Sequence, residues 1–290
     1  MNMKQQKHYF DISELSQSVK VEKPYFAFQK LWQDEQSLVG TFSSEQPLLH
    51  ESGIITAGEL GRHMAILGSC TAVALHNGPK GYYLATKAHF INKQNKQTSA
   101  DDIFYASAQV LNMDKRSLKI SARVWNKQPV AELICEYTVL TPALFQRNFQ
   151  HYANDSLPAF SDSPYRHPIP IYNLIFQHDK LDAFAGPLSP RQCAGHFSGY
   201  PCWPVAIISQ TAIDVTGELI LKKYGLGTRF SVLDSQLSAK KLIGADSILK
   251  FSIEIIPSPD SPCLVKCIVN VYHNNELAAN LINQLELLLP

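Results

Sequence analysis

Two stretches of the chain are apolar on nearly every side, and runs in which apolar and polar residues alternate follow each of them. The stretches are about 60–75 and 205–213. A helix without a polar face has to be buried, so both stretches are predicted to be central helices. The alternating runs are typical of antiparallel strands that bury one face.

Four strands are predicted after each helix, and a short strand and a loop before it. The predicted strands of the first half are 82–90, 103–111, 118–125 and 130–139, and those of the second half are 229–237, 247–256, 263–272 and 277–288. The two halves therefore have the same predicted order of elements.

Weak self-similarity between the halves supports this interpretation. Residues 64–72 align with 204–212, residues 98–103 with 242–248, and residues 125–131 with 272–278. The offsets are 140, 144 and 147 residues. Three matches in the same order, with slowly growing offsets, indicate a duplicated unit.

A segment rich in Pro, Ser and Asp separates the halves. Residues 154–170 contain four prolines, a composition typical of a linker. We therefore predict an N-terminal unit over residues 1–153, a linker over 154–170 and a C-terminal unit over 171–290.

The segment just before the second helix places a histidine in a glycine-rich turn. It runs Gly195-His196-Phe197-Ser198-Gly199-Tyr200-Pro201-Cys202-Trp203-Pro204. This segment resembles the active-site segment of the 3-hydroxyacyl-(acyl-carrier-protein) dehydratases, whose pattern is roughly G-H-F-P-G-x-P-x-x-P-G before a helix with an acidic residue. The resemblance implies the α+β hot-dog fold of that family. For the whole chain it implies a double hot-dog, with two antiparallel sheets that each wrap a central apolar helix.

The residues of this segment suit thioester chemistry. An imidazole titrates near neutral pH, so His196 is the predicted base that removes the proton next to a thioester carbonyl. Backbone N–H groups at the helix start, near Gly199 and Pro204, would stabilise charge on the carbonyl oxygen. Phe197, Gly199 and Pro204 are therefore predicted to bind the substrate.

The resemblance fails at one chemically important position. Where the family has Asp or Glu on the helix, this chain has Gln210, which cannot deliver a proton at neutral pH. Asp214 lies one helical turn further on, on nearly the same face. The resemblance also implies a site between the two units, so the first helix is a second source of the acid. Cys70 aligns with Gln210 there, and Glu59 and His63 are the candidates near it.

Three functions stay open at this point. The main prediction is a dehydratase that acts on a 3-hydroxyacyl thioester of acyl-carrier protein in fatty-acid or polyketide assembly, with His196 as the base. The alternative is a hot-dog acyl thioesterase in which Gln210 and Asp214 position water. The third is a module that binds an acyl group or a carrier protein without turnover. The first half is predicted to be a degenerate copy, because no G-H-F pattern surrounds His50 in its corresponding loop.

Composition limits which partners and which cellular location we expect for the protein. A net charge of +1 gives no support for a nucleic-acid or membrane-surface partner. The chain shows no bilayer-spanning apolar run and no secretory signal, and its six cysteines lack C-x-x-C spacing, so a cytoplasmic protein with reduced thiols is predicted. No metal or organic cofactor is expected, since neither reaction needs one. The implied partners are an acyl-carrier-protein or CoA thioester and a second copy of the chain in a homodimer.

Overall fold

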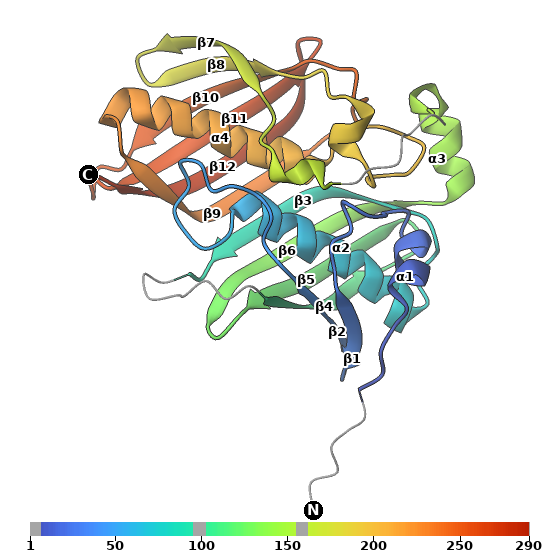
Figure 1. Cartoon of the computed structure of the whole chain (residues 1–290). Helices are drawn as coiled ribbons and strands as arrows, with labels where there is room; N and C mark the ends of the chain where they lie inside the picture. The colour runs from blue at the N-terminus through green and yellow to red at the C-terminus, as the bar shows by residue number, and fades with distance from the viewer. Residues whose placement is uncertain (1–6, 95–102, 155–161, 290) are drawn as a thin grey trace, which may run out of the picture.

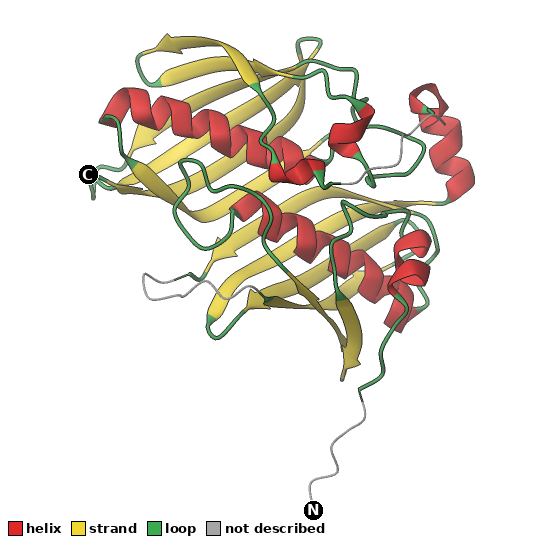
Figure 2. Cartoon of the chain, in the orientation of Figure 1, coloured by secondary structure: helices red, strands yellow, loops and turns green. Residues whose placement is uncertain are grey.

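The computed structural model describes residues 7–94, 103–154 and 162–289. They form two similar halves, each with one long helix lying across a curved antiparallel sheet (Figure 1). The long helices are α2 (Ala57–His76) and α4 (Val205–Tyr224). Figure 2 shows both of them on the same side of a continuous layer of strands. The two predicted central helices are confirmed.

The ends of these helices follow ordinary capping chemistry. The Thr56 side chain accepts a hydrogen bond from the backbone N–H of Glu59 at the start of α2, and Asn77 ends that helix in the left-handed conformation. Gly225, with a φ of +103°, ends α4. The shorter helical segments are α1 (Ile12–Ser18), α3 (Pro142–Phe149), η1 (Gln150–Tyr152), η2 (Pro164–Arg166) and η3 (Pro190–Cys193).

Twelve strands of the described chain make one antiparallel sheet. They are β1 (Lys30–Asp34), β2 (Ser37–Phe42), β3 (Tyr82–Asn92), β4 (Phe104–Met113), β5 (Ser117–Trp125), β6 (Pro129–Leu140), β7 (Ile171–Gln177), β8 (Lys180–Ala185), β9 (Arg229–Ala239), β10 (Leu249–Pro257), β11 (Leu264–His273) and β12 (Glu276–Leu288). Their order is β1-β2-β4-β5-β6-β3-β9-β12-β11-β10-β8-β7. All eight strands predicted after the helices are present, with bounds that differ by no more than two residues.

The predicted fold class is confirmed, and the sheets of the two halves are joined edge to edge. Strand β3 pairs with β9 from Lys87–Ser238 to Ile91–Asp234, and this pairing makes the sheet continuous. Each of these strands would otherwise be an open edge with unpaired N–H and C=O groups. The order of strands on either side of the β3–β9 junction is the same, as a duplicated unit requires.

The repeat is confirmed, but one of its three alignments is wrong. Since α2 begins at residue 57 and α4 at residue 205, the helices correspond at an offset of 148 rather than 140. Both runs are so uniformly apolar that the pattern fits equally well about two helical turns away. The counterpart of Gln210 is therefore Arg62, not Cys70. The match of 125–131 with 272–278 is confirmed as the β5–β6 and β11–β12 turns, and most of 98–103 lies outside the described residues.

The predicted linker is only partly described. Residues 155–161 lie outside the described part, and Tyr165 in η2 is buried, with its hydroxyl donating to the carbonyl of Ala194 at 2.7 Å. The division into units at residues 153 and 171 stays a prediction. All six cysteines carry free thiols. In the part of the chain that the structure describes, no helix is long and apolar enough to cross a membrane.

Candidate active site

A cavity of about 390 Å³ lies between the two long helices and the centre of the sheet. Its walls come from α2 and α4 and from strands β3, β6, β9 and β12. Most of the lining is apolar, and His196 and Arg62 are among the polar side chains that reach it. No Asp or Glu of the described chain lines it. An apolar chamber with a few polar groups is the usual form of a small-molecule site.

The loop that carries His196 is fixed by contacts with the N-terminal segment. The backbone N–H of Glu22 donates to the carbonyl of Gly195 at 2.7 Å, and His196 forms an isolated bridge with Val21. A Cβ atom at Gly195 would lie 2.2 Å from the Glu22 carbonyl oxygen, and the φ of Gly195 is +80°. Glycine is therefore required at this position for two reasons, the close approach of the backbone and its left-handed conformation.

His196 is held as a neutral imidazole. Its Nδ1 lies 3.3 Å from the sulfur of Cys202, and its ring meets that of Tyr25 edge-on at a centroid distance of 5.0 Å. Burial lowers the pKa of His196 to about 3, because desolvation disfavours the charged form. Nε2 has no hydrogen-bond partner in the described parts of the chain. This second ring nitrogen is therefore free to act on a ligand.

The start of α4 presents two open backbone donors. Val205 and Ala206 line the cavity, and their N–H groups have no acceptor among the residues that the structure describes. The next two N–H groups, of Ile207 and Ile208, donate to the carbonyl of Pro204 at 3.0 Å. Pro204 provides no side-chain cap. The positive end of a 20-residue helix is thus uncapped, and it belongs to the same cavity wall as His196.

The start of α2, by contrast, is filled by side chains. Glu51 Oε1 accepts from the N–H of Ala57 at 2.9 Å, and Gln210 Oε1 accepts from the N–H of Gly58 at 3.1 Å. Gln210 Nε2 in turn donates to Asp214 Oδ1 at 2.9 Å. Gln210 therefore caps the other helix, and neither it nor Asp214 lines the cavity. The α2 end is closed and the α4 end is open.

Two buried carboxyl groups belong to this closed end. Burial raises the pKa of Glu51 to about 8 and that of Asp214 to about 7. Glu51 is 2% exposed, and its Oε2 has no hydrogen-bond partner within the described residues. His50 Nε2 lies 3.2 Å from Glu218 Oε1, and both of these side chains are partly exposed.

The structure separates the predicted site residues into those at the cavity and those away from it. Of the eight, His196 and Phe197 line it. Gly199 and Pro204 shape the loop and the helix start without lining the cavity, and the amide donors beside them belong to Val205 and Ala206. Gln210, Asp214, Glu59 and His63 lie outside the lining.

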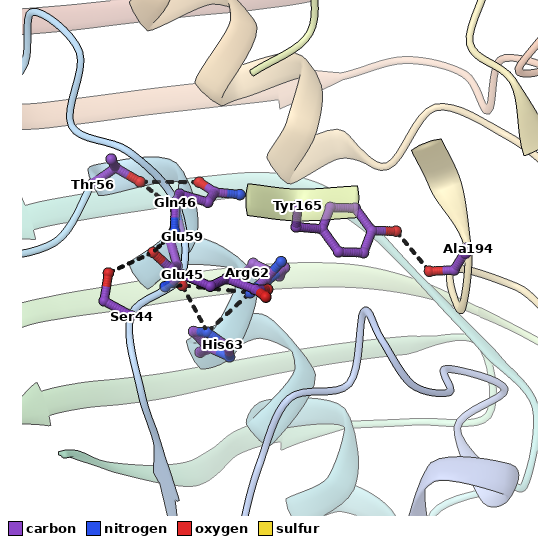
Figure 3. Close-up of polar contacts among 9 residues, drawn as sticks. All are labelled: Ser44, Glu45, Gln46, Thr56, Glu59, Arg62, His63, Tyr165 and Ala194. Carbon is purple, nitrogen blue, oxygen red and sulfur yellow. Dashed lines mark hydrogen bonds and ion pairs between the residues drawn. The ribbon is translucent and has the colours of Figure 1, made fainter. Parts of the chain in front are cut away.

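Glu59 and His63 belong to a buried polar network at the start of α2 (Figure 3). The Glu59 carboxylate accepts hydrogen bonds from Ser44 Oγ and from the backbone N–H groups of Glu45 and Gln46, at 2.8 to 3.1 Å. His63 stacks on Phe42 at 4.0 Å, and burial lowers its pKa to about 4. These contacts hold the loop after β2 onto the helix.

Tyr25 and Arg62 are among the cavity residues that sequence reasoning missed. The Arg62 guanidinium is fully buried, and its Nη2 donates to Glu45 Oε1 at 2.6 Å. The rings of Tyr25 and Tyr165 lie 5.5 and 5.0 Å from its Cζ. Neither residue belongs to a sequence motif. The corrected repeat is the one signal that could have found Arg62, since it is the counterpart of Gln210.

Neither a family model nor a curated protein sequence matches the chain. Solved structures match it over nearly its whole length. A TesB protein from Mycobacterium avium subsp. paratuberculosis covers 96% of this chain and 100% of its own, with a TM-score of 0.59 and 11% identity. TesB2 of Mycobacterium marinum, an acyl-CoA thioesterase II, covers 96% and 98%, with a TM-score of 0.54 and 9% identity. A 12:0-ACP thioesterase from Umbellularia californica covers 92% and 100%, with a TM-score of 0.54 and 10% identity. The likeness shows the fold, which is the predicted double hot-dog.

Proposed function

We propose that the protein hydrolyses acyl thioesters at the open end of α4. The observation that carries the proposal is the pair of unpaired N–H groups of Val205 and Ala206, which share a cavity with a neutral His196. A thioester carbonyl placed there would accept both hydrogen bonds, and these would strengthen as its oxygen becomes negative. The apolar remainder of the cavity suits an acyl chain.

The proposed reaction needs one base and one set of donors. His196 Nε2 removes a proton from water, while Nδ1–H faces the sulfur of Cys202. The water oxygen attacks the carbonyl carbon, and the Val205 and Ala206 amides stabilise the oxyanion. The C–S bond then breaks, the leaving sulfur takes the proton from His196, and the products are a carboxylic acid and a thiol.

Dehydration, the main prediction from sequence, needs a second group that protonates a leaving hydroxyl. The described lining of the cavity contains no carboxyl group that could supply this proton. At the position on α2 that corresponds to Gln210, the chain has Arg62, which does not release its proton. Burial also raises the pKa of Tyr25 well above its usual value. Hydrolysis is the better fit because it requires no such acid.

The thioesterase alternative is kept, but with different residues. Gln210 and Asp214 lie at the closed end, so in our proposal His196 activates the water instead. The names of the structural neighbours support hydrolysis, since they include an acyl-CoA thioesterase and a 12:0-ACP thioesterase. Lys240 and Lys241 line the cavity and would suit a phosphate of either carrier.

A mass-spectrometric assay tests this function. The purified protein is incubated with octanoyl-CoA, 3-hydroxyoctanoyl-CoA and the corresponding carrier-protein thioesters, and products are followed by intact mass and thiol release. We expect free thiol from saturated and hydroxylated substrates alike. Loss of water from the hydroxylated substrate alone would identify a dehydratase. A stable complex without any product would identify a binding protein.

A further inference from the structure

Tyr25 is the one cavity tyrosine whose hydroxyl has no hydrogen-bond partner among the residues that the structure describes. The hydroxyls of Tyr83 and Tyr137 also belong to the cavity wall, but they donate to the carbonyls of Pro79 and Ala65 at 2.7 and 2.8 Å. The Tyr25 ring contacts His196 directly, at a centroid distance of 5.0 Å. The residue that carries this unused donor is therefore in contact with the proposed base.

Arg62, whose Cζ lies 5.5 Å from the Tyr25 ring centroid, adds unpaired donors. Its Nε and Nη1 are buried without a hydrogen-bond partner in the described chain, and the residue is part of the cavity wall. Figure 3 shows the guanidinium beside Glu59, Glu45 and the ring of Tyr165. A buried donor left without an acceptor destabilises the folded state, and more so when it is charged. Such a group is favoured where a ligand supplies the missing acceptor.

The number of donors exceeds what a simple acyl thioester can use. Its carbonyl oxygen accepts from Val205 and Ala206, which leaves the Tyr25 hydroxyl and the Nε and Nη1 donors of Arg62 without an acceptor in the described chain. A second oxygen on the acyl chain, close to the thioester, would satisfy them. Because the Tyr25 ring contacts that of His196, we assign this second oxygen to the part of the acyl chain nearest the thioester.

The charges around Arg62 decide which kind of oxygen fits. Its guanidinium already faces two carboxylates, with Glu45 Oε1 at 2.6 Å and Glu59 Oε1 at 3.6 Å. A carboxylate on the ligand would meet these as like charges, whereas a neutral oxygen would not. A keto oxygen only accepts hydrogen bonds, but a hydroxyl brings one more donor to a place with a surplus of donors.

We propose that the cavity selects 3-oxoacyl thioesters, with the 3-keto oxygen accepting a hydrogen bond from Tyr25 and supported by Arg62. This inference rests on the proposed thioester hydrolase function and names its substrate class. Tyr25 and Arg62 are then specificity-determining residues, and the Val205 and Ala206 amides serve the thioester carbonyl itself.

Binding of stable analogues separates this inference from the reaction. In dethia-CoA analogues a methylene replaces the thioester sulfur, so the carbonyls remain but hydrolysis does not occur. The dissociation constants of octanoyl, 3-hydroxyoctanoyl and 3-oxooctanoyl dethia-CoA are measured by calorimetry. We expect the 3-oxo analogue to bind about tenfold more tightly than the octanoyl analogue, which corresponds to about 1.4 kcal/mol.

Matched variants then identify the donors. Tyr25→Phe removes only the hydroxyl, and Arg62→Lys keeps the charge facing Glu45 but loses the Nε–H and Nη1–H donors. Both should lower the 3-oxo to octanoyl affinity ratio toward one. Tyr83→Phe, which removes a hydroxyl already bonded to Pro79, should leave that ratio as in the wild type.

The outcomes distinguish this inference from the proposed function. Equal affinity for the 3-oxo and octanoyl analogues, a preference for the 3-hydroxy analogue, or a 3-oxo preference that survives in both Tyr25→Phe and Arg62→Lys would overturn the inference alone. Absence of binding by all three analogues would overturn the thioester site and the inference together. Thiol release from octanoyl-CoA without any 3-oxo preference would leave the function in place and remove only the substrate class.

Discussion

At the scale of single residues, the site combines one side chain that sequence can find with others that it cannot. His196 lies in a local glycine-rich motif, so its placement at the cavity follows from consecutive residues. Tyr25 and Arg62 reach the same cavity from distant segments, and only the folded chain brings them together. The lowered pKa of His196 could not be predicted from sequence either, because it depends on desolvation in the folded protein rather than on residue type.

The lowered pKa of His196 predicts an unusual pH dependence of hydrolysis. A base acts only when unprotonated, and with a pKa of about 3 it stays unprotonated at every pH above about 4. We expect kcat/KM for octanoyl-CoA to show no ionisation near 6.5 when thiol release is measured between pH 5 and 8. An imidazole with an ordinary pKa would halve the rate at about pH 6.5, and that result would contradict the lowered pKa of His196.

At the scale of elements, the difference between the two helix starts determines which end is open. Sequence predicted both helices, yet it assigned Gln210 to the active site. Its bond to the N–H of Gly58 is made across 152 residues of chain, so nothing local to Gln210 reveals it. The uniform apolarity of the two helices also hid their true alignment. A pattern of hydrophobic residues thus determines that a helix is buried, but not which polar groups meet at its end.

Two glycines of α2 give opposite predictions for alanine. At Gly58, a Cβ atom would lie 2.5 Å from Gln210 Oε1 and 2.7 Å from its Cβ, so Gly58→Ala should destabilise the fold by about 1–3 kcal/mol. At Gly61 nothing lies within 4 Å, so Gly61→Ala should gain up to about 1 kcal/mol of helix stability. Urea unfolding measures both. Equal shifts in one direction would contradict the close packing of the helices at Gly58.

Glu51 predicts how stability at the closed end depends on pH. Its pKa is about 8 in the folded protein and near 4.5 when unfolded, so the folded state binds the proton more tightly. The stability that Glu51 contributes is complete below pH 4.5 and is lost as pH rises to about 8, at up to about 1.4 kcal/mol per pH unit. Glu51→Gln removes this loss. We expect its unfolding free energy, relative to the wild type, to rise between pH 5 and 8, and a constant difference would contradict the raised pKa.

At the scale of the whole molecule, duplication gives two related helix starts. The start of α2 is closed by side chains, and the start of α4 is open. Pairing of β3 with β9 joins the halves, and the cavity takes its walls from both of them. The order of elements and the fold could be predicted from sequence because each follows from hydrophobic periodicity repeated twice. The pairing of β3 with β9 could not be predicted from sequence, because the edge strands of both halves have the same alternating pattern. The proposed homodimer and the unit boundaries stay predictions.

The most direct test of catalysis at the open end of α4 compares one substitution at each helix start. Thiol release from octanoyl-CoA is measured for the wild type, His196→Asn at the open end of α4 and Glu51→Gln at the closed end of α2, with thermal unfolding of each variant as the control. We expect His196→Asn to lower kcat/KM by about 100-fold or more while remaining folded, and Glu51→Gln to stay within about threefold of the wild type. Loss of activity in Glu51→Gln with activity retained in His196→Asn would place the reaction at the other helix and contradict the account.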